Sequence, residues 1–332
     1  MIVEERAYAR AGLLGNPSDG YFGKTVSISI KNFGAHILLY ESPELFIQPA
    51  DSDVNSFRNV FAMIEEIDHN GYYGGDRLIK AAIKKFVQYC QKNKIPLVNR
   101  NFTVRYHSSI PRQVGLAGSS AIITATMRAL IKFYGVKIEQ KVLPTLVLNA
   151  EVEELGINAG LQDRVIQVYE GCVYMDFEKA YLQKHNYGKY VRVNPEKMTS
   201  NIYVAYKTDL SKVSGTVLND IKVRYDRGDK EVIDTLAEIA GLADRGRVCI
   251  EEGNLDELNE LIDHNFNLRK KIMHITDSNI ELVETARKCG ASAKFSGSGG
   301  AIIGLYKNND MLTRLIVELK KINARVIKPF IK

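Results

Sequence analysis

Apolar and polar residues follow two different periods along this chain, and these periods predict a mixture of strands and helices. Alternation at Val26, Ile28 and Ile30 predicts a strand that follows a turn cluster at residues 15–20. Apolar residues at helical spacing from Leu78 to Val87 predict a helix over residues 76–92. The same criteria predict strands at residues 35–40, 101–107, 173–177, 201–206 and 301–306 and at the C-terminal end, and helices at residues 55–69, 119–134, 141–154, 229–251, 255–270, 277–289 and 309–322.

The order of these elements indicates the fold class. Strands and helices mix without the strict alternation of a doubly wound sheet, so an α+β architecture is expected in both halves. A chain of 332 residues is longer than a single hydrophobic core usually serves, which favours two domains. A polar, lysine-rich stretch at residues 178–200 is the expected junction. We therefore predict an N-terminal domain over residues 1–190 and a C-terminal domain over residues 191–332.

Composition narrows the class of protein. Apolar residues make up 45% and charged residues 25% of the chain, as in soluble globular proteins. The net charge of +6 is modest, and no basic tract with interleaved aromatic residues is present, so nucleic acid is not an expected partner. No apolar run is long enough to cross a bilayer, and the first residues lack a secretory pattern. Four scattered cysteines fit reduced thiols. We expect a cytoplasmic monomer or homodimer without a membrane partner.

The strongest chemical motif is a glycine- and serine-rich loop ahead of the helix predicted from Ser119. Glycines let backbone amides approach a ligand closely, and a helix N-terminus adds free N–H groups and a positive dipole end. Together these features favour a phosphate-binding loop. A tight turn with a serine as helix N-cap is the plainer alternative. The whole motif runs through Pro111, Arg112, Gln113, Val114, Gly115, Leu116, Ala117, Gly118, Ser119, Ser120 and Ala121.

A second motif holds carboxylates that suit catalysis. Glu151 lies in a predicted helix, and Asp163 follows a connection that contains Gly160. An acidic side chain can bind magnesium, which prefers oxygen ligands, and another can orient an attacking hydroxyl or take its proton. The plainer alternatives are a solvated helix face for the glutamates and a surface turn for Asp163 and Arg164.

These motifs, taken in order, resemble the galactokinase, homoserine kinase, mevalonate kinase and phosphomevalonate kinase superfamily, the GHMP kinases. The resemblance rests on residues 6–30, the loop at 111–121 and a third motif at 294–300 (Lys-Phe-Ser-Gly-Ser-Gly-Gly). It implies a two-domain fold with an N-terminal domain like ribosomal protein S5 domain 2 and a C-terminal ferredoxin-like domain. Within the superfamily the chain is most similar to the glucuronokinases, on the segments 13–23, 71–75, 110–113, 160–165, 173–177 and 265–269.

The resemblance implies roles for individual residues. Asp163 matches the catalytic aspartate, and Arg10 matches an arginine near the transferred phosphoryl group and that aspartate. Ser120 and Glu151 match positions that bind magnesium. The loop from Pro111 to Ala121 would hold the phosphates of ATP. Residues implied or considered for the sugar are Asn16, Asp19, Lys24, Arg164, Gly297, Ser298, Gly299 and Gly300, with Lys24 and Arg164 as candidates for a substrate carboxylate.

The implied activity is ATP- and magnesium-dependent phosphorylation of the anomeric hydroxyl of D-glucuronate, a uronic acid. Departures from the galactokinase pattern at Tyr8, Ala9 and Asn16 argue against galactose or mevalonate as the substrate. Three alternatives remain open at this point: the same fold acting on a heptose or another hexose, a sugar- and ATP-binding sensor without catalysis, and a nucleic-acid-binding protein.

Overall fold

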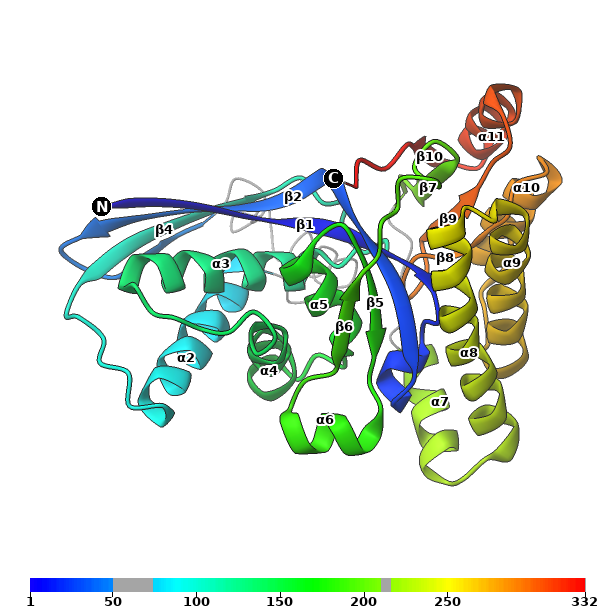
Figure 1. Ribbon diagram of the computed structural model, residues 1–332. Coiled ribbons are helices and arrows are strands. Elements are labelled where there is room, and N and C mark those ends of the chain that lie inside the picture. The colour runs from blue at the N-terminus through cyan, green and yellow to red at the C-terminus, as the bar shows by residue number, and fades with distance from the viewer. Residues whose placement is uncertain (50–73, 210–215, 332) are drawn as a thin grey trace, which may run out of the picture.

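The computed structural model describes residues 1–49, 74–209 and 216–331, with the side chains of residues 216–219 excepted. The helix predicted at 55–69 lies outside these residues, as does most of the segment 71–75. Two sheets, one in each half of the chain, organise the molecule (Figure 1). The α+β architecture predicted for both halves is confirmed.

The first sheet is built around one long antiparallel pair. β1 (Ile2–Leu14) pairs with β2 (Lys24–Ser42), and the short helix η1 (Ser18–Tyr21) lies between them. The order of the other strands is β3-β4-β2-β5-β6. These strands are β3 (Phe46–Gln48), β4 (Asn101–Ser108), β5 (Cys172–Asp176) and β6 (Lys189–Arg192). β1 and β2 supply many fully buried side chains, so this sheet holds the core of the first domain.

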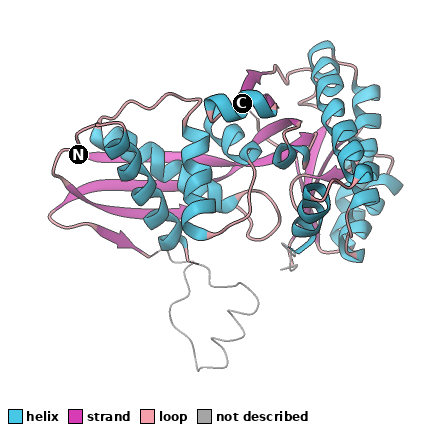
Figure 2. Ribbon diagram, turned by 90° about the horizontal axis from the view of Figure 1, so that it is seen from below, coloured by secondary structure: helices cyan, strands magenta, loops and turns pink. Residues whose placement is uncertain are grey.

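Helices cover one face of this sheet (Figures 1 and 2). α3 (Gly118–Tyr134) packs on β1 and β2, and α5 (Leu161–Tyr169) packs beside it on β1. α2 (Gly75–Lys92) and α4 (Leu143–Leu155) form the outer layer against α3, and α6 (Lys179–His185) joins β5 to β6. α3 is apolar around nearly its whole circumference because it is buried between the sheet and the outer helices. The N-termini of α3 and α5 thereby lie near each other.

The second sheet has the order β10-β7-β9-β8. Its strands are β7 (Ile202–Lys207), β8 (Lys294–Phe295), β9 (Ala301–Leu305) and β10 (Ala324–Ile327). The helices are α7 (Thr216–Asp226), α8 (Lys230–Glu252), α9 (Leu255–Ile272), α10 (Asp277–Lys288) and α11 (Asn309–Lys321). Strand and helix order follow a βαββαβ plan with extra helices before the second strand, which is the expected ferredoxin-like arrangement.

Several contacts with the long strands hold the two domains together. α8 packs against β1 and β2, and α9 and β9 contact β1. The C-terminal segment then returns to the first domain, where the backbone N–H of Lys31 donates to the Phe330 carbonyl at 2.7 Å. The lysine-rich stretch predicted as the junction contains α6 and β6, and β6 completes the first sheet. The boundary predicted between residues 190 and 191 falls within β6 and stays a prediction. No helix among the described residues has the length and apolar character needed to cross a membrane.

Candidate active site

Arg10 is the central side chain of the candidate site. It lies on β1 and is 5% exposed. Its Nε and Nη2 donate to the two carboxylate oxygens of Asp163 at 2.5 and 2.7 Å, and its Nη1 donates to the carbonyls of Gly115 at 2.5 Å and Ser296 at 3.2 Å. One guanidinium therefore joins a strand, a helix and two loops, and its planar fork matches a carboxylate with two parallel hydrogen bonds.

The glycine-serine loop meets the third motif at close range. Gly115 has a positive φ of 68°, a conformation that glycine adopts without strain. A Cβ atom on Gly297 would lie 2.4 Å from the Gly115 carbonyl oxygen and 2.9 Å from Arg10 Nη1. Only a glycine fits there, so the loop of the second domain, which includes Ser298, Gly299 and Gly300, contacts the loop that precedes α3.

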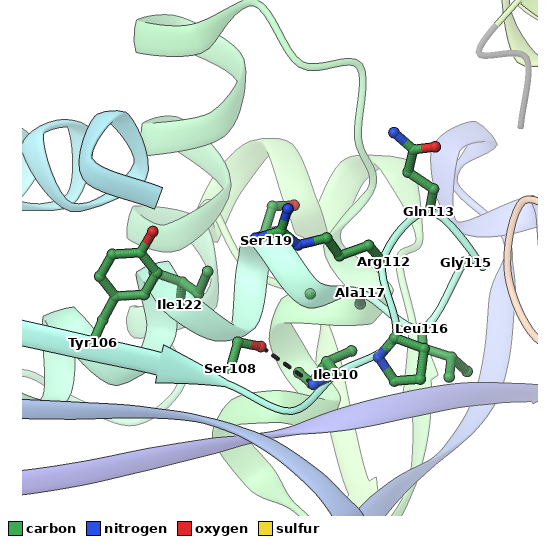
Figure 3. A pocket seen from close by; sticks show the side chains of 12 residues that line it. Tyr106, Ser108, Ile110, Arg112, Gln113, Gly115, Leu116, Ala117, Ser119 and Ile122 are labelled. Atoms are coloured by element: carbon green, nitrogen blue, oxygen red, sulfur yellow. Dashed lines mark hydrogen bonds between the residues drawn. The ribbon is translucent and has the colours of Figure 1, made fainter. Parts of the chain in front are cut away.

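A pocket opens beside the same loop (Figure 3). Tyr106 at the end of β4 and Ile122 on α3 line one part of it, and the backbone from Pro111 to Ser119 lines the other. Figure 3 shows the loop curving through Arg112, Gln113 and Gly115 into the first turn of α3. Apolar side chains at one end and a helix N-terminus at the other suit a ligand with a flat ring and phosphates.

Glu151 lies behind the first turn of α3 and is fully buried. Its Oε1 accepts a hydrogen bond from the Ser119 hydroxyl at 2.9 Å, and its Oε2 accepts from Arg164 Nε at 2.6 Å. The hydroxyl of Ser120 instead donates to the Ala117 carbonyl at 3.2 Å. In this structure Ser119 rather than Ser120 is therefore the serine in contact with Glu151.

Two aspartates at the site have opposite pKa shifts. Burial alone would raise the pKa of Asp163, but the charge and hydrogen bonds of Arg10, with the charge of Arg164, hold the pKa below its usual value. Desolvation, with the charge of Asp163, raises the pKa of Asp19 to about 6. The protein surrounds the Asp19 carboxyl closely, although the residue keeps some contact with solvent. The backbone N–H of Gln162, at the N-terminus of α5, donates to Asp19 and opposes this shift.

The turn that follows β1 is fixed by polar contacts from the second domain. The side-chain oxygen of Asn265 accepts a hydrogen bond from the Gly15 N–H at 2.9 Å. The ammonium of Lys294 donates to the Asn16 side chain and, at 2.8 Å each, to the carbonyls of Gly12 and Phe295. The peptide bond between Asn16 and Pro17 is cis. Asn16 is thus turned toward the second domain and serves to hold the turn that carries Asp19.

The two cations favoured from the sequence for a substrate carboxylate already have carboxylate partners. Lys24 Nζ lies 2.8 Å from Asp244, and this hydrogen bond raises the pKa of Lys24. Arg164 pairs with Glu151 and also approaches Asp163, with 3.4 Å between Nη1 and Oδ2. Arg164 borders the site but is engaged by the protein itself.

The chain matches two family models: the GHMP kinases N terminal domain over residues 77–171 and the GHMP kinases C terminal model over residues 247–323. It is 42% identical to "Probable glucuronokinase 2" of Arabidopsis thaliana over 99% of this chain and 91% of the relative. This chain belongs to the glucuronokinase family of the GHMP kinases. It is also 40% identical to "Glucuronokinase 1" of the same plant over 95% of this chain and 88% of that relative. The structure resembles that of galactokinase from Lactococcus lactis, with a TM-score of 0.77 and 16% identity over 99% of this chain and 93% of that one, which supports the shared fold.

Several residues of this kinase site have no role assigned from the sequence. Gln162, Asn265, Arg269 and Ser296 are all buried around the Arg10–Asp163 pair or the turn beside it. The pair Asn265 and Arg269 did carry a signal, because the spacing of four places both on one face of a helix and both are polar in an otherwise apolar stripe. Gln162 and Ser296 lie within the segments 160–165 and 294–300 that carry the resemblance, but the sequence assigns no role to either.

The described residues contain no group of three or more side chains that resembles a metal site. One buried carboxylate and one hydroxyl, those of Glu151 and Ser119, face the N-terminus of α3. Magnesium bound with a nucleotide usually takes one or two protein oxygens, and phosphates and water complete its shell. These two oxygens fit magnesium in that manner, and the ion would share the Glu151 carboxylate with Arg164, which pairs with it.

Proposed function

We propose that this kinase transfers the γ-phosphoryl group of ATP to the anomeric hydroxyl of D-glucuronate. The observation that carries the proposal is the paired contact of Arg10 with Asp163 between the two glycine-containing loops. This arginine–carboxylate pair lies between the two loops. A phosphoryl group bound by the glycine-serine loop would there meet a sugar hydroxyl held near Asp19. The similarity to glucuronokinases over nearly the whole chain supports the substrate.

Asp163 would accept a hydrogen bond from the attacking sugar hydroxyl and orient it toward the phosphorus. Its lowered pKa keeps the carboxylate ionised at neutral pH, which suits an acceptor that is ready before the substrate arrives. Arg10 would keep this carboxylate in place and offset negative charge on the phosphoryl group in transit. Asp19 would accept hydrogen bonds from other hydroxyls of the sugar.

The nucleotide would lie in the pocket beside the glycine-serine loop. Its base would rest near Tyr106 and Ile122, and its phosphates would accept hydrogen bonds from the backbone at the start of α3. Glu151 with Ser119 or Ser120 would hold magnesium, which neutralises charge on the phosphates when bound. The contact between Gly297 and Gly115 would keep water away from the join of the two substrates.

The test is phosphorylation of a panel of free sugars. The protein is incubated with ATP, magnesium and D-glucuronate, D-galactose, D-glucose or a heptose, and ADP release is followed. The position of the phosphate is read by phosphorus NMR. We expect turnover on D-glucuronate with the phosphate on C1, and Asp163→Asn to lower kcat by at least about 100-fold because the anionic acceptor is lost.

The matched control is Asp76→Asn, which changes a half-exposed aspartate whose partner is Lys80 on the same helix. It should leave kcat and KM unchanged. Turnover on a different sugar alone would reject glucuronate and keep the phosphoryl-transfer roles. Binding of ATP without turnover on any sugar would favour a sensor over an enzyme.

A further inference from the structure

Arg269 is a buried charge that the roles described above leave unused. It lies on α9, one helical turn after Asn265, and only 1% of its surface is exposed. Burial, with the charge of Arg10, lowers its pKa to about 10, although the charge of Asp19 acts in the opposite direction. The guanidinium is still cationic at neutral pH. An ion placed out of water in this way is costly unless partners satisfy it.

Most of the hydrogen-bond donors of Arg269 have no acceptor among the described residues. A guanidinium has five N–H groups, and the described residues give Arg269 one hydrogen bond, from Nη1 to the Gly297 carbonyl at 3.1 Å. Its Nε is buried and has no hydrogen-bond partner among them. No carboxylate of the described residues lies within ion-pair distance of it.

The other buried cations around the site differ in this respect. Arg10 and Arg164 each bind a carboxylate of the protein. Lys294 has three donors, and all three have oxygen acceptors. Within the described part of the chain, Arg269 is therefore the cation at this site that has capacity left for an anion.

A purely structural role does not account for Arg269. Its guanidinium lies 5.2 Å from the ring centre of Phe295, and such stacking is favourable. Arg287 stacks in the same way on Phe266, at 5.1 Å, and the two rings contact each other edge to face. Arg287, however, also pairs with Asp263 and donates to two backbone carbonyls. Stacking on this aromatic pair thus comes with a carboxylate and two carbonyls as partners in Arg287 and with a single carbonyl in Arg269, while the Nε of each lacks a hydrogen bond among the described residues.

Arg269 lies close to residues that are proposed to take part in the reaction. Gly297, whose carbonyl it contacts, is the residue whose added Cβ would lie 2.9 Å from Arg10 Nη1. Asp19 is close enough for its charge to act on Arg269, and Lys294 is close enough to be repelled by it. Arg269 thus belongs to the second domain and lies near Asp19, the residue proposed to bind hydroxyls of the sugar.

We propose that Arg269 binds the carboxylate of the uronate substrate and makes the kinase select an acidic sugar over a neutral one. This inference rests on the proposed function. With the anomeric hydroxyl at Asp163, the carboxylate lies at the far side of the sugar ring and completes the fork of Arg269 with two parallel hydrogen bonds. The substrate supplies the counter-ion that the described residues lack, so binding energy and selectivity come from the same contact.

The test compares D-glucuronate with D-glucuronamide, which has the same ring and an uncharged amide. The ratio of kcat/KM for the two substrates is measured for the wild-type protein, Arg269→Met and Arg269→Lys. We expect Arg269→Met to lower kcat/KM for glucuronate by at least about 100-fold and to change that for glucuronamide by less than about threefold. Arg269→Lys keeps the charge but not the fork, and its ratio should be intermediate. Calorimetry with each sugar in the absence of ATP should give the same order of affinities.

Arg287→Met is the matched control, since it removes an arginine from the same aromatic pair on the side away from the site. Its substrate ratio should equal that of the wild type. An equal loss for both sugars in Arg269→Met, or an unchanged ratio, overturns the role of Arg269 while glucuronate phosphorylation by the wild type keeps the proposed function. Failure of the wild type to phosphorylate glucuronate overturns both. If Arg269→Met does not fold, the ratio of Arg269→Lys decides, and a wild-type ratio there overturns the proposal.

Discussion

Asp19 and Asp163 are two carboxylates in one site, and their surroundings give them different protonation near neutral pH. Arg10 binds Asp163 with a two-pronged contact and keeps it ionised, whereas Asp19 is desolvated and lies beside that negative charge. Neighbouring acids with separated pKa values are typical of sites where each acid has its own task. Asp19 is therefore the group that titrates in the range where the enzyme is assayed.

A pH profile tests this difference. The pKa of Asp19 in the folded protein is about 6, above its usual 3.8, so the carboxyl is protonated below that pH and loses its capacity as a double acceptor for sugar hydroxyls. We expect kcat/KM for glucuronate to fall as the pH drops through about 6. In Asp19→Asn the activity should be low, and this limb of the profile should be absent. An unchanged midpoint in the variant would assign the limb to another group.

The same shift has a consequence for stability. A carboxyl with a raised pKa in the folded state contributes stability that is fully present below the unfolded pKa and is lost as the pH rises through about 6. At neutral pH the ionised Asp19 opposes folding, so Asp19→Asn should raise the thermal midpoint while it lowers activity. Such an exchange of stability for function is usual at active sites. Scanning calorimetry of both proteins at pH 7 and at pH 4 measures the effect, which should shrink at the lower pH.

Motifs in the sequence indicated which residues lie together at the site, whereas contacts that depend on burial could not be read from it. Arg10 and Asp163 are in contact, as the resemblance implies, and their catalytic roles stay predictions. Arg164 and Lys24 were reasonable cations for the substrate because of their places in sequence, but only the folded structure shows that both have partners. The spacing of Arg269 and Asn265 marks a polar pair on an apolar helix face, but only the structure shows that Arg269 is buried and that its Nε has no hydrogen-bond partner among the described residues.

At the scale of elements, the two glycine loops depend on each other. A Cβ on Gly297 would clash with the Gly115 carbonyl and with Arg10. Gly297→Ala must therefore move the two loops apart until the Cβ atom and the Gly115 carbonyl oxygen are at van der Waals distance. Misplacement of this kind commonly costs about 100-fold in rate. We expect Gly297→Ala to lower kcat by about that factor and to leave the far-ultraviolet circular dichroism unchanged.

Gly241→Ala is the control for this substitution. Gly241 lies on an exposed face of α8, and a Cβ there meets no atom within 4 Å. Alanine at such a position should leave kcat unchanged and raise the free energy of unfolding by about 0.5–1 kcal/mol, because it is the better helix former. Wild-type turnover by Gly297→Ala would show that the loops tolerate separation.

Most helices and strands of the described residues follow the hydrophobic period, and the departures have identifiable causes. Two strands were predicted at residues 26–30 and 35–40, but β2 is continuous from Lys24 to Ser42. A shift in the pairing with β1 between Tyr8 and Ala9 accommodates residues 31–34, where the alternation of apolar residues is interrupted. The helix α5 was not predicted, because it has only nine residues and buries polar side chains. α6 and β6 are short and lie within a lysine-rich stretch, where the apolar pattern is weak.

At the scale of the whole molecule, the C-terminal segment ties the second domain to the first. The Ser29 hydroxyl donates to the Ile331 carbonyl at 3.2 Å, and Asn32 exchanges two hydrogen bonds with Lys328 and Phe330. Ser29 is the β2 partner of Arg10 in the sheet. The tail is therefore anchored beside the strand pair that carries Arg10.

Removal of residues 328–332 should weaken this anchor. The loss of several hydrogen bonds and of the buried Ile331 side chain should lower the free energy of unfolding by about 2–4 kcal/mol. Urea unfolding followed by circular dichroism measures this change. Phe330→Ser, which alters an exposed side chain while keeping the backbone contacts, is the control and should unfold like the wild type. Equal stability of the truncated and full-length chains would show that the tail contributes nothing.

The three-way contact of Arg10 also has a consequence for the synthesis of the chain. Arg10 is synthesised well before Ser296, whose carbonyl it contacts and which lies 286 residues further along the chain. A nascent chain that holds only the first domain therefore lacks this acceptor and the glycine loop of the second domain. We expect such a chain to have no phosphoryl-transfer activity until the second domain has been made.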